Sequence, residues 1–312
     1  MEKPRVIGLG LATIDILMRL SEMPAWEKFN RLSDLKFEGG GPAGTALVAV
    51  ARLGVKAGFI GTAGNDPAGD LKVETFRREG VDTSRLIRRS FPEDQVALVF
   101  VHEESGERTF AAPIGFGREP LEPEELDRDY ITSAAILHLD GFHFDAAMQA
   151  ARWMREAGKR ITLDAGKTDG SLHPRLGELV ALSDVVICGA GVSHYLTGRD
   201  DLQEAGRAVL SLGPKVVVET RGEAGSYTIT RDDTFHTPAF RVQVVDTTGA
   251  GDVFHGAYIV GLLQGWDLRR VARFASAVAA LKCTRLGGRA GIPAMAEVEK
   301  FLREFRDEHP PS

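Results

Sequence analysis

A turn of small residues followed by a carboxylate is the part of the chain best suited to chemistry. It reads Asp246-Thr247-Thr248-Gly249-Ala250-Gly251-Asp252. The small, apolar run 253–263 that follows predicts a buried helix beginning at this turn. The first N–H groups of a helix lack internal partners and the helix dipole favours anions there, so Gly249, Ala250 and Gly251 could bind phosphate oxygens. Asp252 stands where an attacking hydroxyl would lose its proton, which indicates phosphoryl transfer to an alcohol.

A plainer interpretation of this turn is that its glycines separate two elements and that Asp252 only begins a helix. However, the segment resembles the C-terminal signature of the PfkB (ribokinase-like) family of carbohydrate kinases, Asp-Thr-x-Gly-Ala-Gly-Asp before a small, apolar helix. The resemblance implies an ATP-dependent kinase with Asp252 as general base and the 249–251 turn as anion hole. It also implies ATP and Mg²⁺ as cofactors and a primary hydroxyl of a sugar as the acceptor.

A second glycine-rich turn, Gly39-Gly40-Gly41-Pro42-Ala43-Gly44-Thr45, precedes an apolar stretch at 46–53. It also spells G-x-G-x-x-G, but a dinucleotide site needs a buried strand before the glycines, and residues 32–37 alternate polar and apolar instead. The turn resembles the family's N-terminal signature, which implies that Gly40, Gly41 and Thr45 bind the sugar. Relatives often carry Asn where this chain has Thr45.

Asp15 follows the first predicted strand, 6–10, and taken alone it could be a turn or capping residue. It matches the family's sugar-binding Asp, whose two oxygens can accept hydrogen bonds from adjacent hydroxyls. Lys28 and Arg31 in the same segment, and Arg108 in the second hairpin, are basic residues that could contact the substrate, and Lys28 is the one predicted to bind it. An anionic sugar would need such basic groups, and the strand end at 141–143 offers no Arg, so a neutral ketose or related polyol is favoured.

Other substrates stay open. Residues 274–293, together with 39–43, look closest to the sulfofructose kinase branch and more loosely to ketohexokinases. A sulfosugar, a phosphosugar or a nucleoside is therefore an alternative acceptor. Phe110, Phe116 or Phe142 could stack on a nucleoside base.

The nucleotide site is expected in two further regions as well as in the signature turn, although an ordinary strand end and a packed helix would explain the same residues. The resemblance implies nucleotide contacts from Thr220, Gly222, Gly225, Thr248, Ser276, Ala279 and Cys283. It also implies that the loop 284–291 helps to enclose adenine. Asp246 and Thr248 are the candidate ligands of a monovalent cation such as K⁺.

One departure from the family concerns magnesium. Many relatives carry Asn-x-x-Glu shortly before Leu-Thr-Gly, but here Gly189 and Val192 occupy the matching positions. Mg²⁺ would then be held by phosphates and water, with Asp164 or Glu219 at longer range. The departure also motivates a rival hypothesis, a non-catalytic sugar or nucleotide sensor, against which the intact Asp252 argues.

The elements that must position these groups alternate between apolar strands and helices. Strands are predicted at 6–10, 135–140, 161–164, 185–188 and 216–220, and helices at 146–157, 202–212 and 268–282. The pattern predicts a ribokinase-like, doubly wound, mostly parallel sheet between helices, as one domain over 1–312. Segments 14–37 and 95–112 break the alternation, and the family implies that they form a small β lid that makes a homodimer contact.

Composition narrows the class further. The 312 residues are 43% hydrophobic with a net charge of −6, and no basic run suggests nucleic-acid binding. Without a signal-peptide core or an apolar run long enough to span a membrane, we expect a cytoplasmic protein with no membrane partner. Cys188 and Cys283 lie in apolar segments and are expected to be buried thiols.

Overall fold

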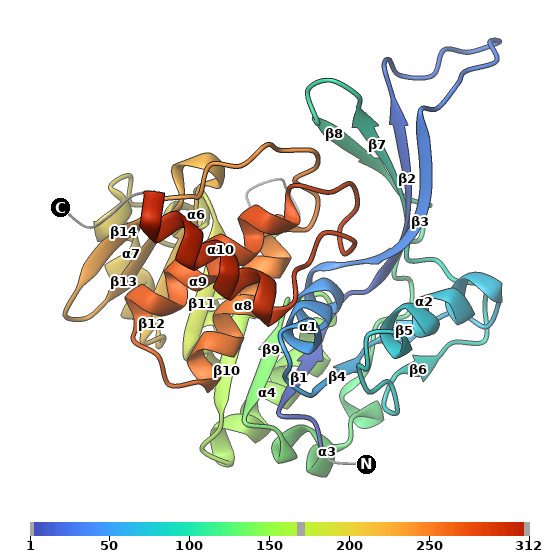
Figure 1. Ribbon diagram of the computed structural model, residues 1–312. Helices are drawn as coiled ribbons and strands as arrows, with labels where there is room; N and C mark the ends of the chain where they lie inside the picture. The colour runs from blue at the N-terminus through green and yellow to red at the C-terminus, as the bar shows by residue number, and fades with distance from the viewer. Residues whose placement is uncertain (1–2, 167–171, 309–312) are drawn as a thin grey trace.

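An eight-stranded sheet forms the body of the protein in a computed structural model that describes residues 3–166 and 172–308 (Figure 1). In spatial order its strands are β14 (Thr234–Thr237), β13 (Ser226–Thr230), β12 (Val216–Thr220), β11 (Val185–Gly189), β10 (Arg160–Asp164), β9 (Ile136–Leu139), β1 (Val6–Leu9) and β4 (Ala57–Ile60). The strands from β12 to β4 are parallel to their neighbours, and β13 and β14 extend the sheet in antiparallel fashion. The mostly parallel sheet predicted from the apolar runs is confirmed.

Helices cover both faces of this sheet. One layer contains α1 (Pro42–Arg52), α8 (Ala250–Leu263), α9 (Leu268–Lys282) and α10 (Met295–Glu308). The other contains α3 (Arg128–Ser133), α4 (Phe144–Glu156), α5 (Leu176–Leu182), α6 (Val192–Thr197) and α7 (Leu202–Leu210). Each layer packs its own apolar core against the sheet, which is the doubly wound arrangement.

Small residues let α8 lie deep between its neighbours. A Cβ at Gly256 would stand 2.4 Å from the carbonyl oxygen of Ala46 in α1, and one at Gly261 would stand 3.0 Å from Val271 in α9. Residues 253–261 of α8 are all buried. The helix that begins at the signature turn is therefore held rigidly on both sides.

The carboxyl ends of the parallel strands meet along one edge of the sheet. Register places Leu9 of β1 opposite Leu139 of β9, and Asp164 of β10 opposite Ile187 of β11. Ligands of open α/β sheets bind outside this edge. Asp140, directly after β9, and Asp164 are thus brought to the same side as the signature turn.

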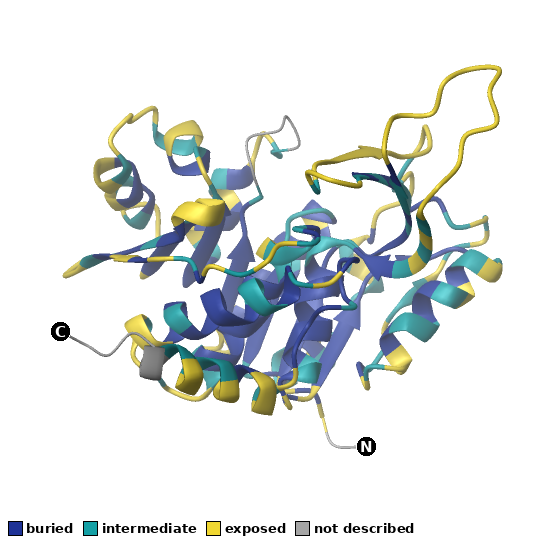
Figure 2. Cartoon of the chain, turned by 45° about the horizontal axis from the view of Figure 1, so that its top comes forward, coloured by how far each residue is buried: buried dark blue, intermediate teal, exposed yellow. Residues whose placement is uncertain are grey.

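A second, four-stranded sheet stands over that edge (Figure 1). Its strands, in spatial order, are β3 (Asp34–Gly40), β2 (Thr13–Leu20), β7 (Val96–His102) and β8 (Arg108–Ala111). β2 pairs in parallel with β7, and the other two pairings are antiparallel. We call this sheet the lid sheet; the exposed loop 21–33 projects from it away from the body (Figure 2).

The remaining elements lie beside the lid sheet and along the chain between the main strands. They are α2 (Pro67–Arg77), β5 (Thr62–Ala63), β6 (Ile87–Arg88) and the short 3-10 helices Pro123–Glu125 and Gly222–Ala224. Three strands that the apolar pattern did not single out, β4, β13 and β14, complete the main sheet. Within the described ranges, no helix is both long enough and apolar enough to cross a membrane.

Candidate active site

The signature turn leads directly into α8. Gly249 is the residue before the helix and has φ +72°, a left-handed conformation that favours glycine. A Cβ there would also stand 2.9 Å from the carbonyl oxygen of Gly288. Gly249 supplies no side-chain cap, which favours an anion at this helix start, although the N–H of Ala250 donates to the carbonyl oxygen of Thr247 at 3.2 Å.

Asp252 lies on the first turn of α8 and is only partly buried, so a substrate can reach it. Burial raises its pKa to about 7, and the charges of Asp164, Asp15 and Asp140 act in the same direction. Arg289 opposes the shift. A carboxylate with a pKa near neutrality is a more effective proton acceptor than one with the ordinary value of 3.8.

Two of these neighbours come from the carboxyl ends of main-sheet strands. Asp140 accepts hydrogen bonds from the backbone N–H groups of Leu11 (2.8 Å), Ala43 (3.2 Å) and Phe142 (2.9 Å). Burial nevertheless raises the pKa of Asp140 to about 6. Asp140 therefore joins the loop after β1 and the start of α1 to its own loop after β9.

Asp164 is the second of these neighbours. It accepts a hydrogen bond from the N–H of Gly166 at 2.8 Å, and its Oδ2 lies 3.6 Å from Nε2 of His255. Burial raises the pKa of Asp164 to about 6 and lowers that of His255 to about 3, so the imidazole is neutral. His255 thus faces Asp164 from α8, one turn beyond Asp252.

Asp15 reaches the site from the lid sheet. Thr13 Oγ1 donates to Asp15 Oδ1 at 2.5 Å, and burial raises the pKa of Asp15, with Thr13 and Arg289 opposing. A Cβ at Gly40 would stand 2.1 Å from Asp15 Oδ2, so glycine is required there. Gly41, with φ +84°, is the N-cap of α1 beside it. The second glycine turn therefore packs against the carboxylate predicted to bind the sugar.

Arg289 is a site residue that sequence reasoning missed. Its guanidinium donates to the carbonyl oxygen of Gly40 (2.6 Å) and to the hydroxyls of Thr45 (3.3 Å) and Thr75 (3.2 Å), and it lies 4.7 Å from the ring centroid of Phe76. Burial lowers its pKa to about 10, against the charges of nearby acids that include Asp15 and Asp252. Thr45, expected to contact the sugar, is buried and accepts a hydrogen bond from Arg289.

The signal for Arg289 was weak. It follows two glycines in a loop that the family resemblance linked to adenine, while its partners Gly40 and Thr45 are more than 240 positions away. A lone arginine in a glycine-rich loop has no periodicity to mark it as buried. Only the tertiary fold brings it under the second glycine turn.

The expected nucleotide residues follow the carboxyl end of β12 and lie along α9. Thr220 ends β12 and donates to the carbonyl oxygen of Cys188 at 3.1 Å. Gly222 and Gly225 have positive φ, and a Cβ at Gly225 would stand 2.1 Å from the carbonyl oxygen of Thr237. These glycines therefore shape the short helix after β12.

Of the residues expected from α9, Cys283 is joined to the signature turn. Ser276 is buried and Ala279 is partly buried on the helix, while Cys283 is its C-cap rather than part of it. The carbonyl oxygen of Cys283 accepts hydrogen bonds from the N–H groups of Val245 (2.8 Å) and Asp246 (3.2 Å). The end of α9 is thereby joined to the start of the turn. The thiols of Cys188 and Cys283 are free and buried, as predicted.

Of the candidates for magnesium, Asp164 fits better than Glu219. Glu219 is buried and already paired with Arg221 at 2.9 Å. Over the described ranges, no cluster of three or more His, Cys, Asp or Glu side chains is arranged to hold a metal. Mg²⁺ commonly uses one or two carboxylates together with substrate phosphates, a requirement that Asp164 and Asp252 could meet.

Lys28 is not brought to these groups. It lies in the exposed loop 21–33, whose local hydrogen bonds include one from Asn30 Nδ2 to the carbonyl oxygen of Lys28. The loop projects away from the body (Figure 2). The structure therefore separates Lys28 from Asp15, although both were predicted to bind the substrate.

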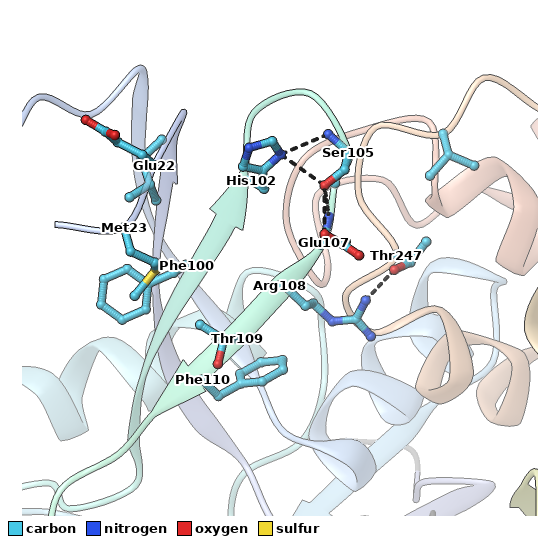
Figure 3. A pocket seen from close by; sticks show the side chains of 13 residues that line it. Glu22, Met23, Phe100, His102, Ser105, Glu107, Arg108, Thr109, Phe110 and Thr247 are labelled. Carbon is cyan, nitrogen blue, oxygen red and sulfur yellow. Dashed lines mark hydrogen bonds between the residues drawn. The ribbon is translucent and has the colours of Figure 1, made fainter.

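The lid sheet touches the signature turn through its β7–β8 hairpin. Arg108 of β8 donates to the hydroxyl of Thr247 (Figure 3). A cavity of about 790 Å³ opens here; it is lined by Leu20, Glu22, Met23, Phe100, His102, residues 105–110, Val244 and Thr247. Asp252 is not among the described residues that line it, so this cavity lies beside the reactive groups rather than on them.

Comparison with known proteins shows the family of this chain. Residues 5–295 match the model of the "pfkB family carbohydrate kinase". An ATP-dependent ribose-1-phosphate kinase of Halopiger xanaduensis is 30% identical over 304 residues, covering 97% of this chain and 99% of the relative. An aminoimidazole riboside kinase of Salmonella typhimurium is 31% identical over 315 residues, covering 96% and 95%.

Solved structures agree as well. A ribokinase from Thermotoga maritima superposes with a TM-score of 0.83 at 27% identity, covering 96% of this chain and 99% of that one. A protein assigned as ribokinase II of E. coli, in complex with ATP and Mg²⁺, has a TM-score of 0.83 at 25% identity, with the same coverage. The fold is shared along nearly the whole chain and the family model matches residues 5–295, so the chain belongs to the pfkB family of carbohydrate kinases.

Proposed function

We propose that this carbohydrate kinase transfers the γ-phosphate of ATP to a primary hydroxyl of a sugar, with Asp252 as general base. The observation that carries the proposal is a partly exposed carboxylate with a pKa of about 7 on the first turn of α8. The N–H groups of Gly249, Ala250 and Gly251 lie directly before it, and that of Ala250 would exchange its 3.2 Å hydrogen bond to the carbonyl oxygen of Thr247 for a phosphate oxygen. Base and anion hole are thus adjacent, as in-line transfer to a hydroxyl requires.

On the sugar side, Asp15 would accept hydrogen bonds from sugar hydroxyls, and Gly40 and Gly41 would let the sugar approach the backbone. Thr45 would act through Arg289, which its hydroxyl contacts. The lid sheet carries Asp15 and stands over the strand ends, so closing it would exclude water from the reacting groups. In this proposal residues 1–312 form one domain with this lid.

On the nucleotide side, the proposed contacts are Thr220, Gly222, Gly225, Thr248, Ser276, Ala279 and Cys283. They come from the end of β12 and the short helix after it, from the signature turn, and from α9 and its C-cap. Bound magnesium would neutralise phosphate charge, and Asp164 would face it, directly or through water. The relative whose structure contains ATP and Mg²⁺ supports this choice of cofactors.

The charge of the site favours a neutral sugar. Asp15, Asp140, Asp164 and Asp252 are close enough for three of them to raise the pKa of the fourth. Arg289 is their buried counter-charge, and its hydrogen bonds already go to Gly40, Thr45 and Thr75. A sulfonate or phosphate on the sugar would therefore meet repulsion from these carboxylates.

A nucleoside is the second candidate substrate. Phe110 of the lid sheet is 51% exposed and lies on the same face of that sheet as Asp15, by the strand register. An exposed aromatic ring there could stack on a base. The similarity to an aminoimidazole riboside kinase supports keeping this alternative.

We also propose a homodimer formed through the outer face of the lid sheet. Glu38 of β3 pairs with Asp15 and so lies on the face of the lid sheet that carries Asp15. Leu35 and Phe37 lie on the opposite face and are 51% and 57% exposed. An apolar sheet face of this kind is covered in a stable assembly.

We further propose a cytoplasmic location. The free, buried thiols of Cys188 and Cys283 suit the reducing cytoplasm.

The test is ADP release with Mg-ATP across ketoses, aldoses, sugar acids, phosphosugars, sulfosugars and nucleosides. We expect a neutral sugar to give the highest kcat/KM, and Asp252→Asn to abolish most of that rate. Asp232→Asn, in the exposed turn between β13 and β14, is the matched control. ATP binding without substrate-dependent ADP release, from folded protein, would instead favour the sensor hypothesis.

A further inference from the structure

A buried lysine lies directly beneath the signature turn. Lys282 ends α9, and its side chain is 0% exposed. Its Nζ donates a hydrogen bond to the carbonyl oxygen of Asp246 at 2.9 Å. Burying an ammonium group costs free energy unless oxygen atoms accept its hydrogen bonds. The position of the Lys282 ammonium at this carbonyl oxygen therefore suggests a specific role.

Both carboxylate oxygens of Asp246 also accept hydrogen bonds. Oδ1 accepts hydrogen bonds from the N–H of Thr248 (2.8 Å) and from its hydroxyl (2.7 Å), and Oδ2 accepts one from the N–H of Gly287 (2.8 Å). Asp246 is 0% exposed. Its carboxylate therefore binds the turn and the loop 284–291 together, while its carbonyl faces Lys282.

A bound monovalent cation does not fit this arrangement. Hard cations bind to oxygen ligands, and the expected ligands were Asp246 and Thr248. The carbonyl oxygen of Asp246 already accepts a hydrogen bond from the Lys282 ammonium group. Both oxygens of its carboxylate accept hydrogen bonds from N–H or O–H groups. A second positive charge at this position would be repelled by Lys282 and would have to displace those donors.

We infer that the Lys282 ammonium replaces the monovalent cation in this chain, so that the signature turn is organised without K⁺. Burial lowers the pKa of the Lys282 ammonium, and the charge of Asp246 acts in the opposite direction. Burial alone would raise the pKa of Asp246, but Lys282 and the donors from Thr248 and Gly287 outweigh it and leave the pKa below its usual value. The two residues thus stabilise each other's charged form.

Lys282 is accordingly a positioning residue. It does not touch the reacting atoms; it anchors the first carbonyl of the turn that presents Gly249, Ala250 and Gly251. The loop after α9 closes over it, since a Cβ at Gly291 would stand 2.2 Å from the carbonyl oxygen of Lys282. Removing the ammonium would leave room for an external cation at the same carbonyl.

The first test compares salts on the wild-type chain. kcat/KM and the melting temperature are measured in KCl and in tetramethylammonium chloride at equal ionic strength. We expect less than a twofold difference in kcat/KM and the same melting temperature. Activation of about fivefold or more by K⁺, or a K⁺-specific rise in melting temperature, would overturn the inference.

The second test uses Lys282→Ala, with Lys300→Ala as the matched control on the exposed face of α10. We expect Lys282→Ala to lose activity and thermal stability and to regain part of both with KCl or methylammonium chloride, but not with tetramethylammonium chloride. Lys300→Ala should show no dependence on the salt. A folded Lys282→Ala variant that ignores K⁺ and methylammonium would contradict the replacement.

Lys282→Met is a second variant that fills the volume and should not be rescued. If neither variant folds, the wild-type comparison decides alone. The catalytic readout rests on the proposed kinase function, but the melting temperatures do not. A chain that phosphorylates nothing in the substrate panel therefore still tests the cation inference.

Discussion

The two ends of the signature turn carry aspartates in opposite electrostatic settings. Asp246 accepts three hydrogen bonds and faces a buried ammonium, so its pKa lies below the usual value despite burial. Asp252, six residues later, lies among other carboxylates, and its pKa rises to about 7. The difference shows how the surroundings of an aspartate set its role. Hydrogen-bond donors surround Asp246, which organises the turn, whereas other carboxylates surround Asp252, which can accept a proton.

The largest effect is expected from Asp252→Asn. Removing a general base should lower kcat by about 10² to 10⁴, and removing a carboxylate that its neighbours repel should not reduce stability. ADP release and chemical denaturation measure the two quantities. Turnover within about tenfold of wild type, from a folded variant, would show that Asp252 is not the base.

Asp246→Asn should act mainly on stability, in contrast to Asp252→Asn. The neutral amide loses a charged acceptor of three hydrogen bonds and leaves Lys282 buried without its counter-charge. We expect a loss of about 2 to 4 kcal/mol in the free energy of unfolding, measured by urea denaturation. A variant as stable as wild type would show that Asp246 does not stabilise the signature turn.

Asp15→Asn tests a third carboxylate, on the sugar side. Loss of a charged hydrogen-bond acceptor should raise the KM for the sugar by about 10- to 100-fold. The KM for ATP should stay the same, since Asp15 lies in the lid sheet. Equal increases in both KM values would mean that the variant distorts the whole site.

The pH dependence should separate the two ends of the turn again. Below pH 7, Asp252 gains a proton and cannot accept another, so kcat/KM should fall by up to about tenfold per pH unit. The raised pKa has the opposite effect on folding. Its stabilising contribution is fully present below the unfolded value near 3.8 and is lost as the pH rises through 7. Denaturation of wild type and Asp252→Asn between pH 4 and 8 measures this contribution.

The smallest effect is expected from Lys28→Ala. Lys28 lies in the exposed loop 21–33, away from both ends of the signature turn. We expect kcat/KM to change by less than twofold. A tenfold loss would show that the lid loop reaches the substrate during turnover and would restore the sequence-based assignment.

Sequence reasoning predicted the fold well where the signal was local. Apolar runs such as 161–164 and 185–188 became strands of a parallel sheet, and the run 253–263 became a buried helix. Strands β13 and β14 were missed because Thr-rich segments at a sheet edge lack a continuous apolar run. Segments 14–37 and 95–112 were set apart because they do not fit the alternation of strands and helices, and in the structure they pair in a separate sheet.

The site was predictable where its residues share one turn, and less so where they come from distant segments. The sequence alone determined the order of glycines and Asp252 before an apolar helix, since backbone freedom and helix polarity are local properties. Only the tertiary structure decided that Arg289 lies under the second glycine turn and that the Lys282 ammonium donates a hydrogen bond to the carbonyl oxygen of Asp246. It also decided that Lys28 lies in an exposed loop away from the other site residues. These outcomes depend on burial and on contacts between residues far apart in the chain, which no local pattern encodes.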